Sequence, residues 1–582
     1  MMKQSIIYYL FTLVVFSLVM VACQKIDAES FTPEDPSINF DQQHVTVGND
    51  VEEIELEINA NLPWRIRTDA AWITLIKANG TAGEKAKIAV QRNRTTEERT
   101  AHIIAYITDA SQTELLLTQA AGDPPPDYTR HFYVKTSGTA GNDGLSWAAP
   151  TTLDKALDEV ADGDFIHIAA GTYAPTTALT GGTASDLKEY TFEIRANVQI
   201  IGGYPTNAQE GAIADPENSP TVLSGNLGSD KARHVVAVTA VKAEDQEVSL
   251  KGLTIRDGNA GGSGNISVNG TNFSRAHGGG IIIGGAKVLI DNCQIIENTT
   301  ANHAAGMYIT NQAVVTIKNS SISKNSASVA ASNGGGIWND GSTLYIYNST
   351  VSENRIGGVG GGVYALNTAR TTYTYMYNVT IANNVTGIFG ANSAAPGYYG
   401  RELSEGVMVN CTIYGNTAGG TGAGGGIRMH GSAKLNVFSS TITNNAGGTG
   451  SGIDMSATGT NEVNLFNTIV AGNTGAATQT AGNGITVSTS IVGSNVYDAD
   501  GVVVAGATFD ATTMLGSLGN HGGLTQTVLP IGTGNPALLY GLNLLQLQLL
   551  SINHNLEEDF VTQDQNDKSR TGKTVMGAAL PL

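Results

Sequence analysis

The side chains best suited to binding a ligand are aromatic residues that recur at a fixed place in a repeated phrase. In "TLYIYNST" and again in "TYTYMYNVT", two tyrosines flank a single apolar residue. Side chains alternate between the two faces of a strand, so the apolar residue points inward and its neighbours point outward. The outward aromatic residues found in this way are Tyr345, Tyr347, Tyr375, Tyr377, Phe438 and Phe466.

Rings on adjacent strands lie about 4.8 Å apart, so these residues are expected to form a stacked row. An exposed aromatic row can bind sugar rings or a partner chain. We therefore interpret the six residues as the candidate ligand-binding set. The alternative is that a loop covers them, and "SAAPGYYG" at 393–400 is the candidate for such a loop.

Catalytic chemistry has a weaker basis in the sequence. A polysaccharide lyase needs clustered carboxylates for calcium and an Arg or Lys base, and a hydrolase needs two paired acids. Arg428 and His430 lie close together in "RMHG", but without an acid nearby in the sequence. The isolated aspartates are Asp257, Asp291, Asp340 and Asp454, and the histidines without metal-ligand spacing are His277, His303 and His430. The sequence therefore predicts no complete catalytic set, no metal and no cofactor, and leaves enzymatic activity open.

Residues 1–22 have the composition of a signal peptide. Lys3 provides a basic start, residues 6–20 are almost continuously apolar, and small residues lead into Cys23. This ending resembles the lipidation site of bacterial lipoproteins, although Met20 stands where Leu, Val or Ile is more common. The resemblance implies acylation at Cys23, and the alternatives are an uncleaved anchor or a plain signal peptide. No other segment of the sequence is long and apolar enough to span a membrane.

The composition excludes several classes of protein. The chain has 582 residues, 71 of them glycine, and only 14% are charged. This composition suits an all-β repeat array better than a helical protein. The net charge is −19, without a basic stripe that could neutralise phosphates, so we expect no nucleic-acid partner.

The elements that position the aromatic rows belong to a repeat of 27 to 32 residues. Its most regular position is an asparagine: Asn298, Asn325, Asn354, Asn384, Asn416, Asn445 and Asn473. Six residues earlier lies a corner position: Asn292, Asn319, Asn348, Asn378, Asn410, Ser439 and Asn467. Asparagine tolerates the left-handed backbone of a tight corner, and identical asparagines one strand apart can hydrogen-bond in a ladder.

One repeat is too short to bury its apolar residues alone, so the copies must stack. The apolar residues recur three and eight positions before the regular asparagine, as in Val351 and Ile346 before Asn354. We predict an all-β fold in which a long right-handed parallel β-helix follows a small sandwich. The repeat resembles that of pectin-lyase-like proteins. Cys293 and Cys411 fall in one column four coils apart, about 19 Å, so both should be free thiols.

The flanking segments carry further resemblances. "LPWRIRTDAAWITL" and the closing "LLLTQ" resemble a BACON domain, which implies a β-sandwich and makes Trp64 a second possible sugar platform, with Trp72 expected in the core. "TTLDKALDEV" has helical spacing, with Thr151 and Asp154 as a capping pair, and should cap the first coil. At the other end, Asp564, Gln565 and Arg570 resemble a choice-of-anchor Q domain, expected to form the last coil and cap, although Asn566 and Asp567 depart from that family's pattern.

These inferences give six consecutive parts. They are a signal peptide (1–22), a tether (23–36), a BACON-like sandwich (37–120), a proline-rich linker (121–130), the β-helix (131–510) and a choice-of-anchor Q-like coil and cap (511–582). We expect a lipid-anchored protein of the cell outer membrane, exposed at the surface, that acts as a binding protein or adhesin for glycan. The alternatives are a polysaccharide lyase or glycoside hydrolase of the same fold and a passive stalk.

Replacement of Cys23 by alanine should release the protein from membranes. Two acyl chains on one cysteine give stable anchoring, whereas a single chain gives only marginal binding. Fractionation of cells expressing Cys23→Ala should therefore find the protein outside the membrane fraction. Unchanged fractionation with membranes would show that lipidation of Cys23 does not hold the protein there.

Overall fold

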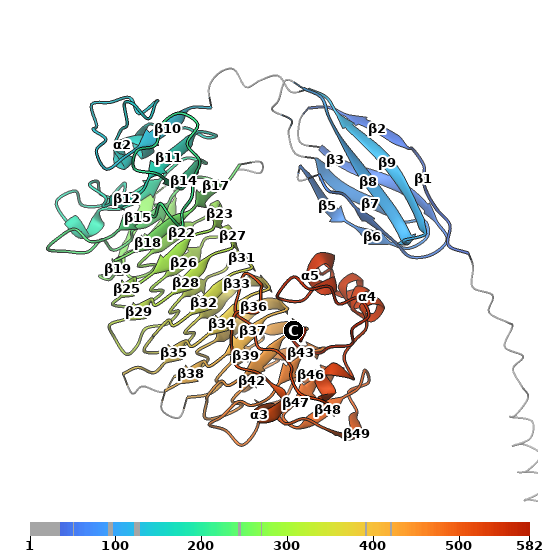
Figure 1. The fold of residues 1–582 in the computed structure, drawn as a ribbon. Coiled ribbons are helices and arrows are strands. Elements are labelled where there is room, and N and C mark those ends of the chain that lie inside the picture. Colours follow the sequence, from blue (N-terminus) through green and yellow to red (C-terminus); the bar gives the residue numbers. More distant parts are fainter. Residues whose placement is uncertain are drawn as a thin grey trace, which may run out of the picture. The chain divides into compact units, whose positions relative to one another are not determined.

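The structure is a computed structural model, and it describes residues 35–49, 52–70, 72–90, 93, 97–121, 129–242, 246–268, 270–389, 393–419 and 422–581. Cys23, the signal peptide and most of the tether lie outside these residues. The chain divides into two compact units, Met1–Asp127 and Tyr128–Leu582. Both units consist almost entirely of β-structure, as the sequence predicts (Figure 1).

The first unit is a sandwich of two sheets around one apolar core. The four-stranded sheet contains, in order, β1 (Ile38–Phe40), β3 (Glu52–Ala60), β7 (Lys85–Val90) and β5 (Ile73–Lys77). The five-stranded sheet contains β2 (His44–Val47), β9 (Ser111–Gln119), β8 (Arg99–Thr108), β4 (Trp64–Arg67) and β6 (Asn79–Gly80). Alternation of apolar and polar residues along these strands places one face of each sheet in the core.

The second unit is a parallel β-helix with three faces. Face one contains β13 (Phe192–Ile194), β16 (Val236–Val238), β22 (Ile281–Gly284), β26 (Met307–Thr310), β30 (Ile337–Asn339), the first halves of β33 (Val363–Tyr377) and β36 (Tyr398–Val409), β39 (Ile427–Gly431), β42 (Ile453–Gly459) and β45 (Thr480–Ala481). Face two contains β10 (His131–Val134), β11 (Phe165–Ala169), β14 (Gln199–Tyr204), β17 (Val248–Lys251), β23 (Lys287–Asp291), β27 (Val314–Lys318), β31 (Thr343–Tyr347), the second halves of β33 and β36, β40 (Lys434–Phe438), β43 (Glu462–Phe466) and β46 (Ile485–Ser488).

Face three is a separate sheet. Its parallel strands are β12 (Gly171–Tyr173), β15 (Thr221–Ser224), β18 (Leu253–Arg256), β24 (Gln294–Ile296), β28 (Ser321–Ser323), β32 (Thr350–Ser352), β34 (Thr380–Ala382), β37 (Thr412–Tyr414), β41 (Thr441–Thr443), β44 (Ile469–Val470) and β47 (Ile491–Val492). Short pairings of β19 (Asn259–Ala260), β25 (Thr299–Thr300) and β29 (Ser326–Ala327), and of β35 (Val385–Thr386) with β38 (Thr417–Ala418), continue the coils, and β20 (Asn265–Val268) and β21 (Thr271–Ser274) form a hairpin.

The inward columns predicted from the repeat form the core of the β-helix. Ile346 and Val351 are fully buried, and the equivalent residues of the other coils line up with them in one continuous cluster. Cys293 and Cys411 lie in this core as free thiols, which confirms the prediction. Burial raises the pKa of both thiols to about 12, so they remain protonated and unreactive near neutral pH.

A continuous ladder of buried asparagine side chains runs through the core edge. Asn354 donates its side-chain amide to Oδ1 of Asn384 at 2.9 Å, and Asn384 donates to Oδ1 of Asn416 at 2.9 Å. The same pattern joins the column from Asn298 to Asn473. From Asn325 onward each Oδ1 also accepts the backbone N–H of the previous asparagine, so the ladder satisfies both side chain and backbone.

The corner position adopts the left-handed backbone. Its φ angles lie between 44° and 56° at Asn292, Asn319, Asn348, Asn378, Asn410, Ser439 and Asn467. Side-chain hydrogen bonds link only some neighbours in this row, such as Asn378 to Asn348 at 3.0 Å. The left-handed corner and the continuous ladder therefore belong to different asparagine columns. The corner side chains do not form a continuous ladder, because several of them bind other segments of the chain.

Each end of the β-helix is closed differently. Helix α2 (Leu153–Glu159) buries Leu153, Ala156 and Leu157 against the first coils. Its N-cap is Thr152, whose Oγ1 accepts the N–H of Lys155, rather than Thr151 as predicted. At the other end, the antiparallel strands β48 (Asn495–Tyr497) and β49 (Val503–Thr508) follow β47 and end the sheet of face three.

The remaining residues do not add a coil, contrary to the sequence prediction for 511–582. We call residues 511–581 the C-terminal strap, because they run back along the outside of the β-helix (Figure 1, red). The strap contains only short helices: α3 (Ala511–Met514), the 3₁₀ turn η2 (Pro536–Leu538), α4 (Leu544–His554) and α5 (Glu558–Thr562). A second 3₁₀ turn, η1 (Leu187–Glu189), belongs to the early coils.

Arg570 anchors the strap to the corner row. Its side chain is fully buried and donates to Oδ1 of Asn410 at 3.1 Å. It also donates to the carbonyl oxygens of Gln563, Val575 and Gly577 at 3.1, 3.2 and 2.9 Å. Burial lowers the pKa of Arg570 to about 10, so the guanidinium stays charged near neutral pH. One buried cation thus holds two stretches of the strap against one corner of the β-helix.

The other two residues that resemble the anchor motif also have structural roles. Gln565 accepts a hydrogen bond from Thr412 at 2.6 Å and donates to Thr380 at 2.9 Å, which ties the strap to two adjacent coils. Asp564 accepts the backbone N–H groups of Lys568 at 2.8 Å and Leu580 at 2.6 Å. These contacts fix the turn that carries Arg570.

Asn384→Ala should destabilise the β-helix far more than Asn436→Ala. The first change leaves two buried donors of Asn354 without their acceptor and removes one donor to the carbonyl of Val351, a cost of about 3 kcal/mol or more. Asn436 is half-buried on the outer surface and accepts one bond, from Asn464. Thermal unfolding of both variants measures the difference, and equal melting temperatures would contradict the ladder.

Arg570→Met should loosen the strap without unfolding the β-helix. Asn410 Oδ1 and three carbonyl oxygens of the strap lose a charged hydrogen-bond donor, which costs about 3 kcal/mol or more. The coils of the β-helix keep their own hydrogen bonds. Hydrogen exchange should accelerate in residues 540–581 and remain slow in β31 and β33. Lys573→Met removes an exposed cation of the same segment and should change neither. Unchanged exchange in Arg570→Met would show that another contact holds the strap.

Candidate ligand-binding faces

Three tyrosines on face two form a stack of nearly parallel rings, which we call the tyrosine platform: Tyr345, Tyr373 and Tyr375. The rings of Tyr345 and Tyr375 lie 4.9 Å apart at an interplanar angle of 13°. Those of Tyr373 and Tyr375 lie 6.4 Å apart at 9°. Tyr373 is 36% exposed, and the other two are half-buried. The sequence prediction missed Tyr373, which lies two residues before Tyr375 on the same strand and therefore on the same side.

The strap covers the rest of the predicted aromatic row. Tyr377 and Phe438 are only 4% and 2% exposed, because Leu542, Leu547 and Leu556 of the strap pack on them. The Phe560 ring lies 5.0 Å from Tyr377 and 5.6 Å from Tyr347, and His554 lies 5.0 Å from both Phe438 and Phe466. Tyr347, Tyr377, Phe438 and Phe466 are therefore structural contacts in this structure, which corrects the prediction that they form an open ligand-binding row.

The loop expected to cover the row does not do so. Residues 398–400 begin β36 on face one, where Tyr398 is fully buried in the core and Tyr399 is 5% exposed. The cover comes instead from the C-terminal strap, more than a hundred residues later in the chain. The sequence of its helix α4 does not follow the pattern of the repeat.

Burial controls the charge of these rings. The Tyr347 hydroxyl donates to Oε1 of Glu557 at 2.6 Å, and burial raises the pKa of both groups. Burial also raises the pKa of Tyr375 to about 12, and that of Tyr345 in the same direction. Tyr345 and Tyr375 therefore present neutral rings and hydroxyl groups over the physiological range of pH.

Trp64 is a core residue, not a sugar platform. It is 1% exposed, and its indole N–H donates to the carbonyl oxygen of Thr81 at 3.0 Å. The alternation of β4 sends Trp64 and Ile66 into the sandwich core. Trp72 packs against the same core at partial burial, and the guanidinium of Arg99 lies 4.3 Å from its ring centre.

Face one carries a second outward row that the sequence prediction missed. Strand register aligns Tyr308, Trp338, Tyr364, Tyr399, Arg428 and Asp454. Each follows the inward residue after the glycine-rich turn. At Gly334 and Gly360, with φ of 70°, an added Cβ would lie 3.0 Å from Trp338 Cβ and 2.6 Å from Tyr364 Cβ. The glycine runs therefore both turn the chain and make room for the outward row. A glycine run in the sequence is thus the signal by which this row could have been identified.

Charged residues gather where this row ends. We call Arg401, Glu402, Arg428, His430 and Asp454 the face-one polar cluster. Arg428 Nε lies 3.1 Å from Asp454 Oδ2, Arg401 Nε lies 3.1 Å from Glu402 Oε1, and His430 Nδ1 lies 3.7 Å from Glu402 Oε1. Arg428 and His430 thus do have neighbouring acids, contrary to the sequence interpretation, because adjacent coils supply them from 26 to 28 residues away.

Partial burial shifts the titration of this cluster. Burial raises the pKa of Asp454, and the charge of Arg428 opposes that shift. Burial, followed by the charges of Arg401 and Arg428, lowers the pKa of His430. A neutral imidazole beside two guanidinium groups can accept a proton, and guanidinium groups bind carboxylates.

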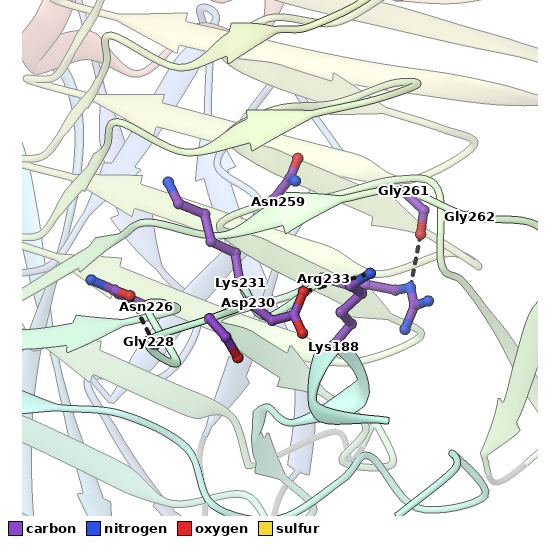
Figure 2. A pocket seen from close by; sticks show the side chains of 10 residues that line it. Lys188, Asn226, Gly228, Asp230, Lys231, Arg233, Asn259, Gly261 and Gly262 are labelled. Carbon is purple, nitrogen blue, oxygen red and sulfur yellow. Dashed lines mark hydrogen bonds and ion pairs between the residues drawn. The ribbon is translucent and has the colours of Figure 1, made fainter. Parts of the chain in front are cut away.

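A pocket with a volume of about 530 Å³ lies among the early coils and is lined by polar residues such as Asn226 and Asn259 (Figure 2). Lys188 pairs with Asp230 at 3.6 Å. Arg233 donates to Glu189 at 2.7 Å and to the carbonyl oxygen of Gly261 at 2.8 Å. Lys188, Asp230 and Arg233 of this lining are therefore each paired with an opposite charge.

Within the residues that the structure describes, no group of three or more His, Cys, Asp or Glu side chains is placed to hold a metal ion. None of the described helices has the length and apolar character needed to cross a membrane.

Two family models match parts of the chain. The model of BACON, a putative N-terminal binding domain, matches residues 62–120, and that of the right-handed β-helix region matches residues 259–397. No match was found among curated proteins. The chain therefore contains a BACON domain and a right-handed β-helix.

Solved structures resemble the chain only loosely. They include pectate lyase Pel9A (15% identity, 65% of this chain and 82% of that one, TM-score 0.37) and a rhamnogalacturonan lyase (12% identity, 62% and 87%, TM-score 0.21). A Bacteroides ovatus GH5 xyloglucanase in complex with a XXXG heptasaccharide matches over 28% of this chain and 45% of that one (17% identity, TM-score 0.14). A shared fold does not carry an activity with it, so function has to be argued from the two faces.

Proposed function

We propose that this protein binds glycan at the cell surface through the tyrosine platform. The observation that carries the proposal is the arrangement of Tyr345, Tyr373 and Tyr375 as nearly parallel rings with accessible edges on a rigid sheet. The strap covers the neighbouring aromatic residues but leaves these three at least partly accessible. Large aromatic rings that stay partly exposed to solvent suggest that this surface binds a ligand.

The surroundings of the platform suit a sugar better than an apolar partner. Thr316 and Thr343 lie beside Tyr345 and Tyr373 in the same outward rows, and Glu405 follows Tyr373. Hydroxyl and carboxylate groups at the edge of stacked rings provide hydrogen-bond partners for sugar hydroxyls. The rings are held by strand pairing on both sides, so little conformational entropy is lost on binding.

Anchoring at Cys23 would display this face outside the cell. Acylation there would hold the protein in the outer membrane, and residues 24–36 and the BACON domain would separate the β-helix from the lipid. In this proposal the partners are a polysaccharide or a cell-surface glycan and the membrane itself. The strap would serve as the choice-of-anchor Q-like segment, with Arg570 and Gln565 holding it to the coils.

The face-one polar cluster supports a second candidate, a polysaccharide lyase or hydrolase. Its basis is the convergence of Arg428, His430, Asp454 and Glu402 from three adjacent coils beside the Tyr399 ring. A neutral His430 could accept a proton while Arg401 or Arg428 binds an acidic group of the substrate. The two candidates use different faces, so separate substitutions distinguish them.

Residues 24–582 should be retained in gels that contain one or more members of a panel: polygalacturonate, alginate, xylan, mannan and xyloglucan. Tyr345→Ala/Tyr373→Ala should weaken retention by about 2 kcal/mol, roughly 30-fold, because two aromatic contacts to the ligand are lost. Tyr540→Ala removes a tyrosine that is 43% exposed on the strap and should bind like the parent.

The same incubations should yield no new reducing or unsaturated ends. New ends that disappear in Arg428→Ala but persist in Tyr345→Ala/Tyr373→Ala would overturn the binding proposal in favour of the enzyme. Retention equal to that of the parent in the double tyrosine variant would show that the platform is not the binding surface.

A further inference from the structure

A second block of aromatic and imidazole rings lies on face two, on the same two outward rows as the tyrosines. Row A runs through His131, Phe165, Gln199, Ser249, Leu289, Thr316, Tyr345 and Tyr375. Row B runs through Tyr133, His167, Ile201, Lys251, Asp291, Lys318, Tyr347 and Tyr377. Aromatic or imidazole rings thus occupy both rows at β10 and β11 and again at β31 and β33.

The rings of the first block are stacked in the same way as those of the tyrosine platform. The rings of His131 and Phe165 lie 4.8 Å apart at 11°, and those of Phe165 and His167 lie 6.1 Å apart at 6°. His131 is exposed, and Phe165 and His167 are half-buried. We call these three residues the first-coil platform.

Hydrogen bonds and a buried tryptophan hold the first-coil platform in place. His131 Nδ1 and His167 Nε2 lie 2.8 Å apart, and His167 Nδ1 lies 2.8 Å from the Tyr204 hydroxyl. Trp147, 7% exposed, packs against Tyr133 at 4.8 Å and against Tyr204 at 5.2 Å. The platform is therefore preorganised, as a binding surface requires.

The surface between the two platforms carries no large ring and is mixed in character: half-buried Leu289 in row A and Ile201 in row B lie among polar and charged residues. Row A has Gln199 and Thr316 half-buried, with the small Ser249 buried between its neighbours. Row B has the charged residues Lys251, Asp291 and Lys318. From Phe165 to Tyr345 the rows cross five strand spacings of about 4.8 Å, so the platforms lie roughly 24 Å apart along the axis.

The strap limits this surface at one end. Beyond Tyr375, α4 and α5 pack over Tyr377 and Phe438 and close row B. A ligand on the tyrosine platform that extends along the rows is therefore directed toward the first coils rather than toward the C-terminal end.

We propose that the two platforms are the end subsites of one surface that binds a single linear glycan chain laid along the axis of the β-helix. This inference rests on the proposed glycan-binding function and specifies its ligand as an extended chain long enough to span roughly 24 Å. Once such a chain stacks on one platform, its second contact is intramolecular, so affinity increases sharply with the number of sugar units.

Size-fractionated oligosaccharides of polygalacturonate and of xylan, from disaccharides to dodecasaccharides, test the inference. Calorimetry on residues 24–582 should show weak binding of short chains and a tenfold or larger gain once the chain spans both platforms. His131→Ala/Phe165→Ala should abolish that gain and leave the affinity for short chains unchanged. Phe389→Ala, which removes a phenylalanine that is 48% exposed away from both rows, should behave like the parent. Melting temperatures show whether each variant is folded.

Affinity that does not depend on chain length, or a length-dependent gain that persists in folded His131→Ala/Phe165→Ala, would overturn this inference and leave the proposed function standing. If neither series binds at any length, the intact polysaccharides of the panel decide. Retention there that is equal in the parent and in His131→Ala/Phe165→Ala overturns the inference alone, and retention that falls at least tenfold in that variant supports it. Failure to bind every polysaccharide overturns the proposed function and this inference together.

Discussion

The buried asparagine ladder is the interaction on which the rest of the structure depends. Each side chain donates its amide to the next coil and accepts from the previous coil through its oxygen, so a slip of register by one residue would leave several buried polar groups unpaired. This penalty keeps equivalent residues of successive coils aligned. Because the alignment is strict, any residue type that recurs at one repeat position becomes a straight row on the outer surface. The chemistry of this protein is therefore arranged in rows rather than in a single cleft.

The rows differ in what covers them. On face two, the strap packs on the phenylalanines and on the tyrosines nearest the corner, and Arg570 holds it there with hydrogen bonds to the corner row and to its own turns. The tyrosine platform and the first-coil platform keep accessible ring edges. On face one, the outward row ends in paired charges whose partners come from neighbouring coils. A ligand that follows the axis meets repeated contacts, which favours polymers over small molecules.

Much of the fold could be predicted from the sequence, because the same pattern of apolar, asparagine and glycine positions recurs in many repeats. The inward columns, the left-handed corner and the free thiols follow from spacing and from the properties of asparagine. The helical spacing of its apolar residues predicts the helix at the first coil, but its N-cap is Thr152, one residue after the predicted Thr151. The strap could not be foreseen in this way. It occurs once, its helix α4 has apolar residues on more than one side, and nothing in the repeat indicates which row it covers.

The candidate site shows the same division. Strand alternation found Tyr345 and Tyr375 but did not show that Tyr377 and Phe438 are buried, since burial there depends on the strap. Arg428 seemed to lack an acid because Asp454 and Glu402 are distant in sequence, although the coil register brings them together. For Trp64, the alternation with Arg65 and Arg67 that it shares with Ile66 already favours the core, and the structure places it there.

The most direct test of an aligned, ligand-binding face two is hydroxyl-radical footprinting of residues 24–582 with and without a polysaccharide that retains the protein. The rate of oxidation at each ring, read by mass spectrometry, reports its exposure. We predict protection of Tyr345, Tyr373 and Tyr375 together with Phe165, and no change at Tyr540. Protection of Trp338 and Tyr399 on face one, with the face-two rings unchanged, would contradict this assignment of the binding face.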